Sequence, residues 1–167
     1  MHTKEDYVVG KRQGELMVYY PDGVLRRRDY FDKGVFKEGE CYGADGKPVT
    51  HWDYITMPKY TVGLGDNAAI VNAIQRYTEY PHEALLVALN ARILISFIVN
   101  SQGQVINSRI SKEPPAEQIA VVLRPAFESI KKSALAATMK LKAFKPGTLD
   151  GEPVPVSYTV PITFKIR

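Results

Sequence analysis

The last quarter of the chain alternates between apolar and polar residues with an almost uninterrupted two-residue period. The apolar positions are Val154, Val156, Tyr158, Val160, Ile162, Phe164 and Ile166, and the positions between them are Pro155, Ser157, Thr159, Pro161, Thr163, Lys165 and Arg167. This pattern predicts a long strand with one face on a core and the other in water. Because Pro155 and Pro161 have no N–H to donate, the strand belongs at a sheet edge or carries local breaks.

A helix and a hairpin are predicted further upstream. Asp66 is a good N-cap, and apolar residues at helical spacing follow it at Ile70, Ala73, Ile74 and Tyr77. A short amphipathic stretch, Ala84–Leu89, comes next. Two alternating runs, Ile93–Val99 and Val105–Ile110, flank the turn sequence Asn100–Gly103 and predict a β-hairpin.

A longer helical segment is predicted between this hairpin and the final strand. Its apolar residues are Ile119, Val122, Leu123, Ala126, Phe127, Ile130, Ala134, Ala137 and Leu141. Pro125 interrupts the segment, so it either kinks there or divides into two helices with Pro125 in the first turn of the second. The sequence Phe144–Gly147 ends the helix, and Asp150–Gly151 turns the chain into the final strand.

The first third of the chain has a different texture. Residues from about Tyr7 to Tyr54 are rich in Gly, Tyr and charge and show no helical period. Tyr20–Gly23 recurs 23 residues later as Gly43–Gly46, and both end in Asp–Gly, a hairpin-turn signal between β-prone runs. This zone resembles the variant MORN repeat, a short β-hairpin unit. The alternative is an unrelated small β-sheet with two Asp–Gly turns.

Composition limits the possible classes of protein. The 167 residues are 45% apolar and 24% charged, which suits one medium domain or two small ones. No run reaches the roughly 18 apolar residues needed to span a bilayer and no leader opens the chain, so we expect a soluble chain as given. Met1 is either a native terminus or follows a removed leader or anchor. A net charge of +4 is far from a nucleic-acid footprint.

Candidate chemistry is sparse. His2, His51 and His82 lack the spacing of metal ligands, and Cys41 is the single cysteine, so we expect no metal site and no internal disulfide. No phosphate-cradling loop, dinucleotide fingerprint or nucleophile signature occurs, so we expect no cofactor and no catalytic residues. The basic run Arg26–Arg28 is most simply interpreted as a solvated strand face.

Six short fragments in order carry a family resemblance. They are Met57-Pro58-Lys59-Tyr60, Tyr80-Pro81, Ile95–Val99 leading to Gly103-Gln104-Val105, Phe144–Gly147, Asp150–Val154 and Pro161–Phe164. Together they resemble the C-terminal domain of TonB-type energy transducers, in the form common in Bacteroidetes, over about Met57 to Arg167. Departures from the family include Ala91 where a glycine is usual, a longer 114–133 connection, and no membrane anchor or Pro-rich spacer in the chain as given.

Together, the patterns and the resemblance imply an α+β protein with two modules. Residues 1–56 are expected to form an antiparallel β meander of MORN-like hairpins. Residues 57–167 are expected to form a TonB C-terminal-like domain, in which a three-stranded antiparallel sheet packs against two helices.

The resemblance implies a non-catalytic periplasmic module that captures an extended peptide, the TonB box of an outer-membrane transporter, by adding it to a sheet edge. The docking edge we expect is Val156, Ser157, Tyr158, Thr159 and Val160, between two prolines where every residue retains its N–H. The alternative is that the prolines only protect this edge from aggregation.

The resemblance also implies a set of partners. They are a TonB-dependent outer-membrane transporter and, if the full-length protein is anchored in the inner membrane, the ExbB–ExbD motor. A homodimer stays open, and no nucleic acid is expected. The rival interpretation is a periplasmic scaffold, adaptor or cell-wall-binding accessory that uses the same fold without energy transduction.

Overall fold

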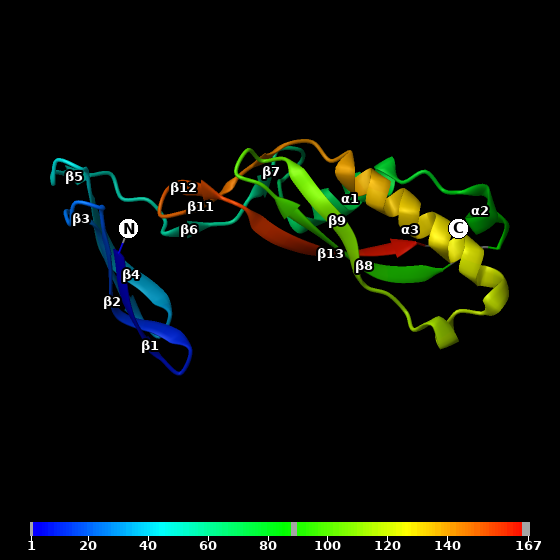
Figure 1. Ribbon diagram of the computed structural model, residues 1–167, viewed down its shortest axis with the longest axis horizontal. Coiled ribbons are helices and arrows are strands. Elements are labelled where there is room, and N and C mark those ends of the chain that lie inside the picture. Colours follow the sequence, from blue (N-terminus) through cyan, green and yellow to red (C-terminus); the bar gives the residue numbers. More distant parts are fainter. Residues whose placement is uncertain (1, 88–89, 165–167) are drawn as a thin grey trace. The chain divides into compact units, whose positions relative to one another are not determined.

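The computed structural model describes residues 2–87 and 90–164. Over these residues the chain is a mixed α+β protein with antiparallel sheets and three helices (Figure 1). It divides into two compact units, Met1–Asp53 and Tyr54–Arg167. The boundary expected from the sequence lies between residues 56 and 57. None of the described helices is long and apolar enough to cross a membrane.

The N-terminal unit is a five-stranded antiparallel sheet in which each strand pairs with the next along the chain. Its strands are β1 (His2–Val8), β2 (Lys11–Tyr19), β3 (Leu25–Asp32), β4 (Val35–Tyr42) and β5 (Pro48–Val49). This order is that of a β meander, blue to cyan in Figure 1.

The turns of this meander repeat in a regular alternation. Two of these turns, Tyr20–Val24 and Gly43–Lys47, share one geometry. In each, the N–H of the first residue donates to the C=O of the fifth residue, at 2.8 and 2.9 Å respectively. In each, the aspartate carboxylate accepts from the N–H two residues later, at 3.0 and 3.1 Å. The other two turns, Val9–Gly10 and Lys33–Gly34, both have two successive residues at positive φ, as two-residue hairpins of type I′ require. A geometric repeat of 23 or 24 residues therefore accompanies the recurrence in the sequence.

A buried ion pair replaces part of the apolar core of this unit. The side chains of Arg27 and Asp29 on β3 are 0% and 1% exposed, so the expectation of a solvated basic run is wrong at Arg27. The Arg27 guanidinium donates to the Asp29 carboxylate and to the Trp52 carbonyl, and His51 Nε2 lies 3.0 Å from Asp29 Oδ1. Gly39 leaves the necessary room, because a Cβ there would lie 2.1 Å from Asp29 Oδ1.

The C-terminal unit is built on a three-stranded antiparallel sheet in the order β13-β8-β9. The strands β8 (Ala91–Val99) and β9 (Val105–Lys112) form the predicted hairpin, which closes where the Asn100 N–H donates to the Gln104 carbonyl at 2.9 Å. The third strand, β13 (Val156–Phe164), pairs with the other side of β8 and lies at the sheet edge, as the prolines predict.

The alternation of the final strand is confirmed, with one break. At Pro155 the chain leaves the sheet, because β12 (Glu152–Val154) pairs with β11 (Gly147–Leu149) and not with β8. Within β13 the buried residues are Val160, Ile162 and Phe164, and the exposed ones are Ser157, Thr159, Pro161 and Thr163. Lys165, Ile166 and Arg167 lie outside the described residues.

The first two helices differ in how well the sequence predicts them. α1 (Asn67–Tyr77) begins as predicted, with the Asp66 carboxylate accepting from the Ala69 N–H at 2.8 Å. The short amphipathic stretch predicted at Ala84–Leu89 overlaps a separate five-residue helix, α2 (His82–Leu86), which begins two residues earlier, while the predicted end, Leu89, lies outside the described residues. The described residues therefore form three helices, one more than the two expected to pack on the sheet.

The third helix, α3 (Arg124–Met139), has Pro125 in its first turn, the second of the two predicted alternatives. The residues upstream form two short 3-10 turns, η1 (Ala116–Gln118) and η2 (Val121–Leu123), instead of a helix from Ile119. The physical reason is that a proline ring cannot donate the backbone hydrogen bond and clashes with a preceding helical turn. A helix can therefore begin at Pro125 more easily than it can run through it.

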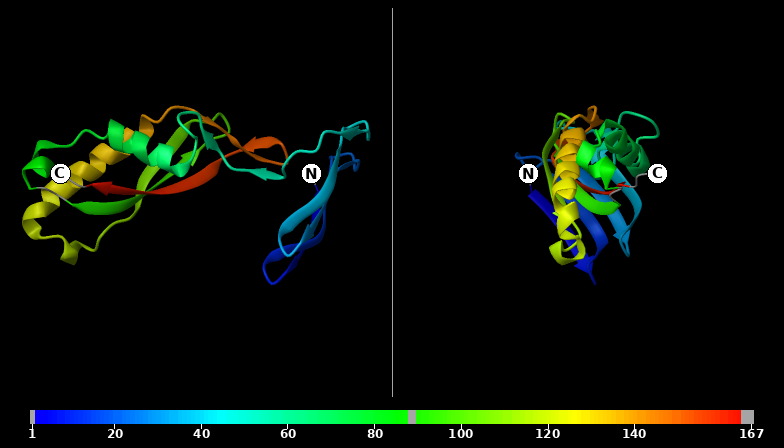
Figure 2. Two further views of the ribbon diagram at one scale, coloured as in Figure 1. Left: turned by 180° about the vertical axis from the view of Figure 1, so that it is seen from behind. Right: turned by 90° about the vertical axis from the view of Figure 1, so that its right-hand side faces the viewer.

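The core of this unit lies where the helices pack on one face of the sheet. α1 packs against β13, and α3 against β8 and β9 (Figure 2). Two small ladders complete the unit: β6 (Ile55–Thr56) pairs with β11, and β7 (Lys59–Tyr60) pairs with β10 (Phe144–Lys145). Buried residues of the core include Ile70, Ile74, Ile93, Ile95, Phe97, Phe127, Ile130, Ile162 and Phe164.

Candidate docking edge

The strand β13 is a regular edge. Its nine residues pair with β8 without a register shift, from Val156 opposite Val99 to Phe164 opposite Ala91. All five residues predicted for docking, Val156–Val160, lie in this strand. The structure therefore places the predicted residues together on one edge.

Only every second residue of this edge points its peptide groups outward, because successive peptide groups of a strand alternate in direction. Asn100, which follows β8, donates its N–H across the hairpin at 2.9 Å. By alternation Val99 points the other way, so its partner Val156 is hydrogen-bonded to β8. The same holds for residues 158 and 160. Ser157 and Thr159 therefore direct their N–H and C=O groups away from the sheet.

Two further observations agree with this assignment. Pro161 falls in the outward series, where its missing N–H breaks no ladder bond. The carbonyl of Thr163, next in the series, accepts a hydrogen bond from Gln75 Nε2 of α1 at 3.1 Å. Helix α1 therefore covers the edge at Thr163, and the open stretch runs from Ser157 to Pro161.

Tyr158 anchors the strand from its inner face. Its ring stacks on that of Phe97, with centroids 5.7 Å apart and planes at 8°. Its hydroxyl donates to the carbonyl of Pro58 at 2.5 Å, and burial raises the pKa of this phenol. On the outer face, Thr159 Oγ1 lies 2.7 Å from Ser96 Oγ. Tyr158 thus holds the edge in place, while Thr159 lies where a partner can reach it.

The opposite edge of the sheet is irregular. β9 shifts register against β8 twice, between Leu94 and Ile95 and between Ser96 and Ile98. Asn107 at the second shift has a φ of 53°. Such bulges twist an edge and interrupt its row of hydrogen-bonding groups, so β9 is the poorer template for an added strand.

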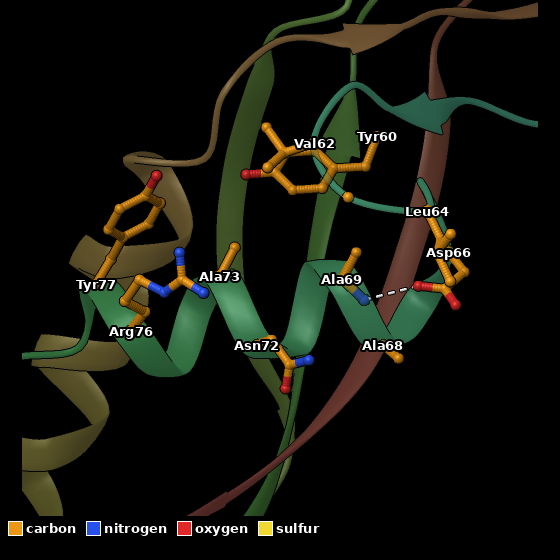
Figure 3. Close-up of a pocket in the computed structure, with 11 residues that line it drawn as sticks. Tyr60, Val62, Leu64, Asp66, Ala68, Ala69, Asn72, Ala73, Arg76 and Tyr77 are labelled. Atoms are coloured by element: carbon orange, nitrogen blue, oxygen red, sulfur yellow. Dashed lines mark hydrogen bonds between the residues drawn. The ribbon is translucent and has the colours of Figure 1, made fainter.

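A cavity of about 280 Å³ lies between the chain after β7 and helix α1, and no single residue in the sequence predicts it (Figure 3). Its lining is mostly apolar and includes Val62, Leu64 and Ala69. The Asp66 carboxylate at its rim is engaged by the cap of α1, and burial raises the pKa of Tyr60. Within residues 2–87 and 90–164, no three His, Cys, Asp or Glu side chains gather to hold a metal ion.

Comparisons with known proteins give one family. The family model for the Gram-negative bacterial TonB protein C-terminal matches residues 76–166. A solution structure of the Helicobacter pylori TonB C-terminal domain is 17% identical over 64% of this chain and 87% of that chain, with a TM-score of 0.41. A second solution structure of that domain is 23% identical over 57% and 88%, with a TM-score of 0.32. No curated protein matches.

The family match covers more than half of the chain. Residues 76–166 begin in the last turn of α1 and include α2, the hairpin of β8 and β9, α3 and all of β13. The edge strand and the elements that support it therefore lie inside the matched region. The chain belongs to the family of Gram-negative bacterial TonB protein C-terminal domains.

Proposed function

We propose that the C-terminal unit captures an extended peptide of an outer-membrane transporter by strand addition to β13, as part of energy-coupled transport. The family supports this, because the TonB C-terminal domain is a non-catalytic periplasmic module that interacts with TonB-dependent transporters. The observation that carries the proposal is the open, regular stretch from Ser157 to Pro161, which presents outward peptide groups between two prolines.

The number of these groups sets the expected affinity. Ser157 and Thr159 each offer one N–H and one C=O, and Pro161 offers a C=O, which gives at most five hydrogen bonds. At about 0.5–1.5 kcal/mol each, they contribute roughly 2.5–7.5 kcal/mol. Association costs at least about 4 kcal/mol in lost freedom. We therefore expect backbone pairing alone to bind a peptide weakly, and side-chain contacts to set its register.

The two prolines are consistent with both a docking edge and an edge protected from aggregation. Pro155 and Pro161 remove donors at the two ends of the open stretch, which limits pairing to a short segment. A short edge with polar Ser and Thr side chains is also a poor template for aggregation. Docking and protection are therefore compatible.

The N-terminal unit carries a separate part of the proposal. Its 23- or 24-residue alternation of turns supports MORN-like hairpin repeats in this unit. Coupling to the ExbB–ExbD motor requires that the full-length protein be anchored in the inner membrane. The sequence encoded upstream of Met1 tests this point: a membrane span supports transduction, whereas a cleaved secretion signal alone supports a periplasmic adaptor.

Proline substitution tests the docking edge. A box peptide from a transporter of the same organism is titrated against the chain and against Thr159→Pro, Thr159→Ala and Thr163→Pro. Thr159→Pro removes an outward N–H and places a ring in the path of the peptide, so we expect at least about a fivefold loss, given about 1 kcal/mol per hydrogen bond. Thr159→Ala retains the backbone groups and is expected to change affinity little.

Thr163→Pro is the matched control. It makes the same backbone change on the same strand but lies where α1 already covers the edge, so we expect it to leave peptide affinity nearly unchanged. The peptide affinity of each variant is interpreted only after thermal unfolding shows that the variant is stably folded. Unimpaired binding by a stably folded Thr159→Pro protein would exclude this segment and make the β9 edge, Val105–Ile110, the candidate.

A further inference from the structure

A second recess in the C-terminal unit lies where β8 begins and β9 ends. It has a volume of about 410 Å³ and is open to solvent. Its main lining residues are Arg92, Leu94, Lys112, Pro114, Pro115 and Gln118. Arg92 and Lys112 are exposed and Leu94 is half-buried, so the recess is a groove with an aliphatic floor and cationic sides.

The charges of this groove come from Arg92 and Lys112. In the part of the chain that the structure describes, no carboxylate forms an ion pair with Arg92 or Lys112. Glu113 also lines the groove, but Lys131 of α3 binds its carboxylate. The strands β8, β9 and β13 contain three basic residues, including Arg109, and no Asp or Glu. This end of the sheet therefore attracts anions.

The spacing of the cations selects an extended chain. Lys112 is the cross-strand partner of Leu94, so Arg92, two residues before Leu94, is its diagonal neighbour. Diagonal neighbours of this kind are about 7–8 Å apart. In an extended peptide, side chains at positions i and i+2 project to the same side and are roughly 6.8 Å apart. Two carboxylates separated by one residue therefore match the two cations.

We propose that this groove binds an acidic peptide segment in extended conformation, with carboxylates at i and i+2 on Arg92 and Lys112 and the peptide backbone over Leu94. The site differs from the docking edge: Arg92 lies opposite Thr163, whereas the open edge ends at Pro161. A single-stranded nucleic acid fits less well, because the aromatic residues of these strands, Phe97, Tyr158 and Phe164, lie on the inner face and offer no outer stacking platform.

Binding of a labelled peptide to the full chain tests the proposal. The probe is an acetylated, amidated heptapeptide of Ala and Ser with glutamate at its third and fifth positions, followed by fluorescence anisotropy at low salt. Exposed ion pairs contribute about 0.2–1 kcal/mol, so we expect Arg92→Gln and Lys112→Gln to weaken binding by up to about fivefold each. A matched peptide with glutamine in place of both glutamates is expected to lose both contributions, and added salt to weaken the acidic peptide alone.

Two control variants separate a site from net charge. Arg76→Gln on α1 and Lys145→Gln on β10 remove the same charge from exposed residues elsewhere in this unit. We expect both to retain full affinity, and amide NMR shifts on titration to centre on Leu94 and Lys112. Equal losses in the control variants, equal binding of the glutamine peptide, or tighter binding of oligo-dT or anionic vesicles through the same two cations would overturn the proposal. Affinity for the transporter box peptide is expected to stay unchanged in Arg92→Gln, which separates this outcome from that of the docking edge.

Discussion

Phe164→Ala tests whether the alternating face of β13 carries the core of the C-terminal unit. Phe164 is 1% exposed, and its ring meets that of Tyr80 edge-on with centroids 6.1 Å apart. Burying a Phe side chain is worth about 1.5–3 kcal/mol, and the cavity left behind raises the cost of Phe→Ala to roughly 3–5 kcal/mol. Thr159→Ala on the opposite face loses one part-buried hydroxyl contact, with Ser96, and is expected to cost about 1 kcal/mol.

The chain offers a way to assign the loss to one unit. Its single tryptophan, Trp52, lies in the N-terminal unit, so tryptophan fluorescence reports that unit, whereas far-UV circular dichroism reports both. With a urea slope of about 1–3 kcal/mol/M, Phe164→Ala is expected to lower the midpoint of the circular-dichroism transition by at least roughly 1 M. The fluorescence transition is expected to stay in place. Small and equal losses for Phe164→Ala and Thr159→Ala would show that the alternation has been misinterpreted.

Two further predictions concern the units. Asp29→Asn leaves the buried Arg27 without its charged partner and is expected to cost roughly 3–5 kcal/mol in the Trp52 fluorescence transition. Glu15→Gln breaks the neighbouring ion pair of Glu15 and Arg28, in which the two side chains are 38% and 55% exposed, and is expected to cost less than about 1 kcal/mol. Equal costs for Asp29→Asn and Glu15→Gln would refute the role of burial. A fragment of residues 54–167 is expected to unfold cooperatively on its own, and a non-cooperative melt would show that its core needs the N-terminal unit.

The features that the sequence predicts well are those set by local chemistry. The two-residue period of β13, the cap at Asp66 and the Asp–Gly turns each depend on residues close together in the chain. The position of Pro125 in the first turn of α3 was one of two alternatives, and the preceding 3-10 turns decide between them. Such features need no knowledge of which elements become neighbours.

The features that the sequence does not predict depend on distant partners. Arg27 is buried because its guanidinium donates hydrogen bonds to Asp29 and to the Trp52 carbonyl, and because Gly39 leaves space for Asp29. These residues come from three separate segments of the chain. The prolines predict an edge or a break, but that the break falls at Pro155 depends on β11, which pairs with the residues before it. Alternation alone also cannot say which peptide groups of β13 pair with β8. The sequence therefore counts an N–H group at all five residues of Val156–Val160, whereas only Ser157 and Thr159 direct theirs outward.

The same geometry bears on whether the protein can pair with itself through this edge. Two copies joined at β13 would use the outward groups of Ser157, Thr159 and Pro161, which are the groups that a captured peptide needs. A homodimer of this kind and peptide capture therefore exclude each other. Pro161 lacks the donor that a longer shared ladder requires, and α1 already occupies the Thr163 carbonyl. An edge this short pairs weakly with any strand, so side chains that match its outer face must favour one peptide over a second copy of the chain.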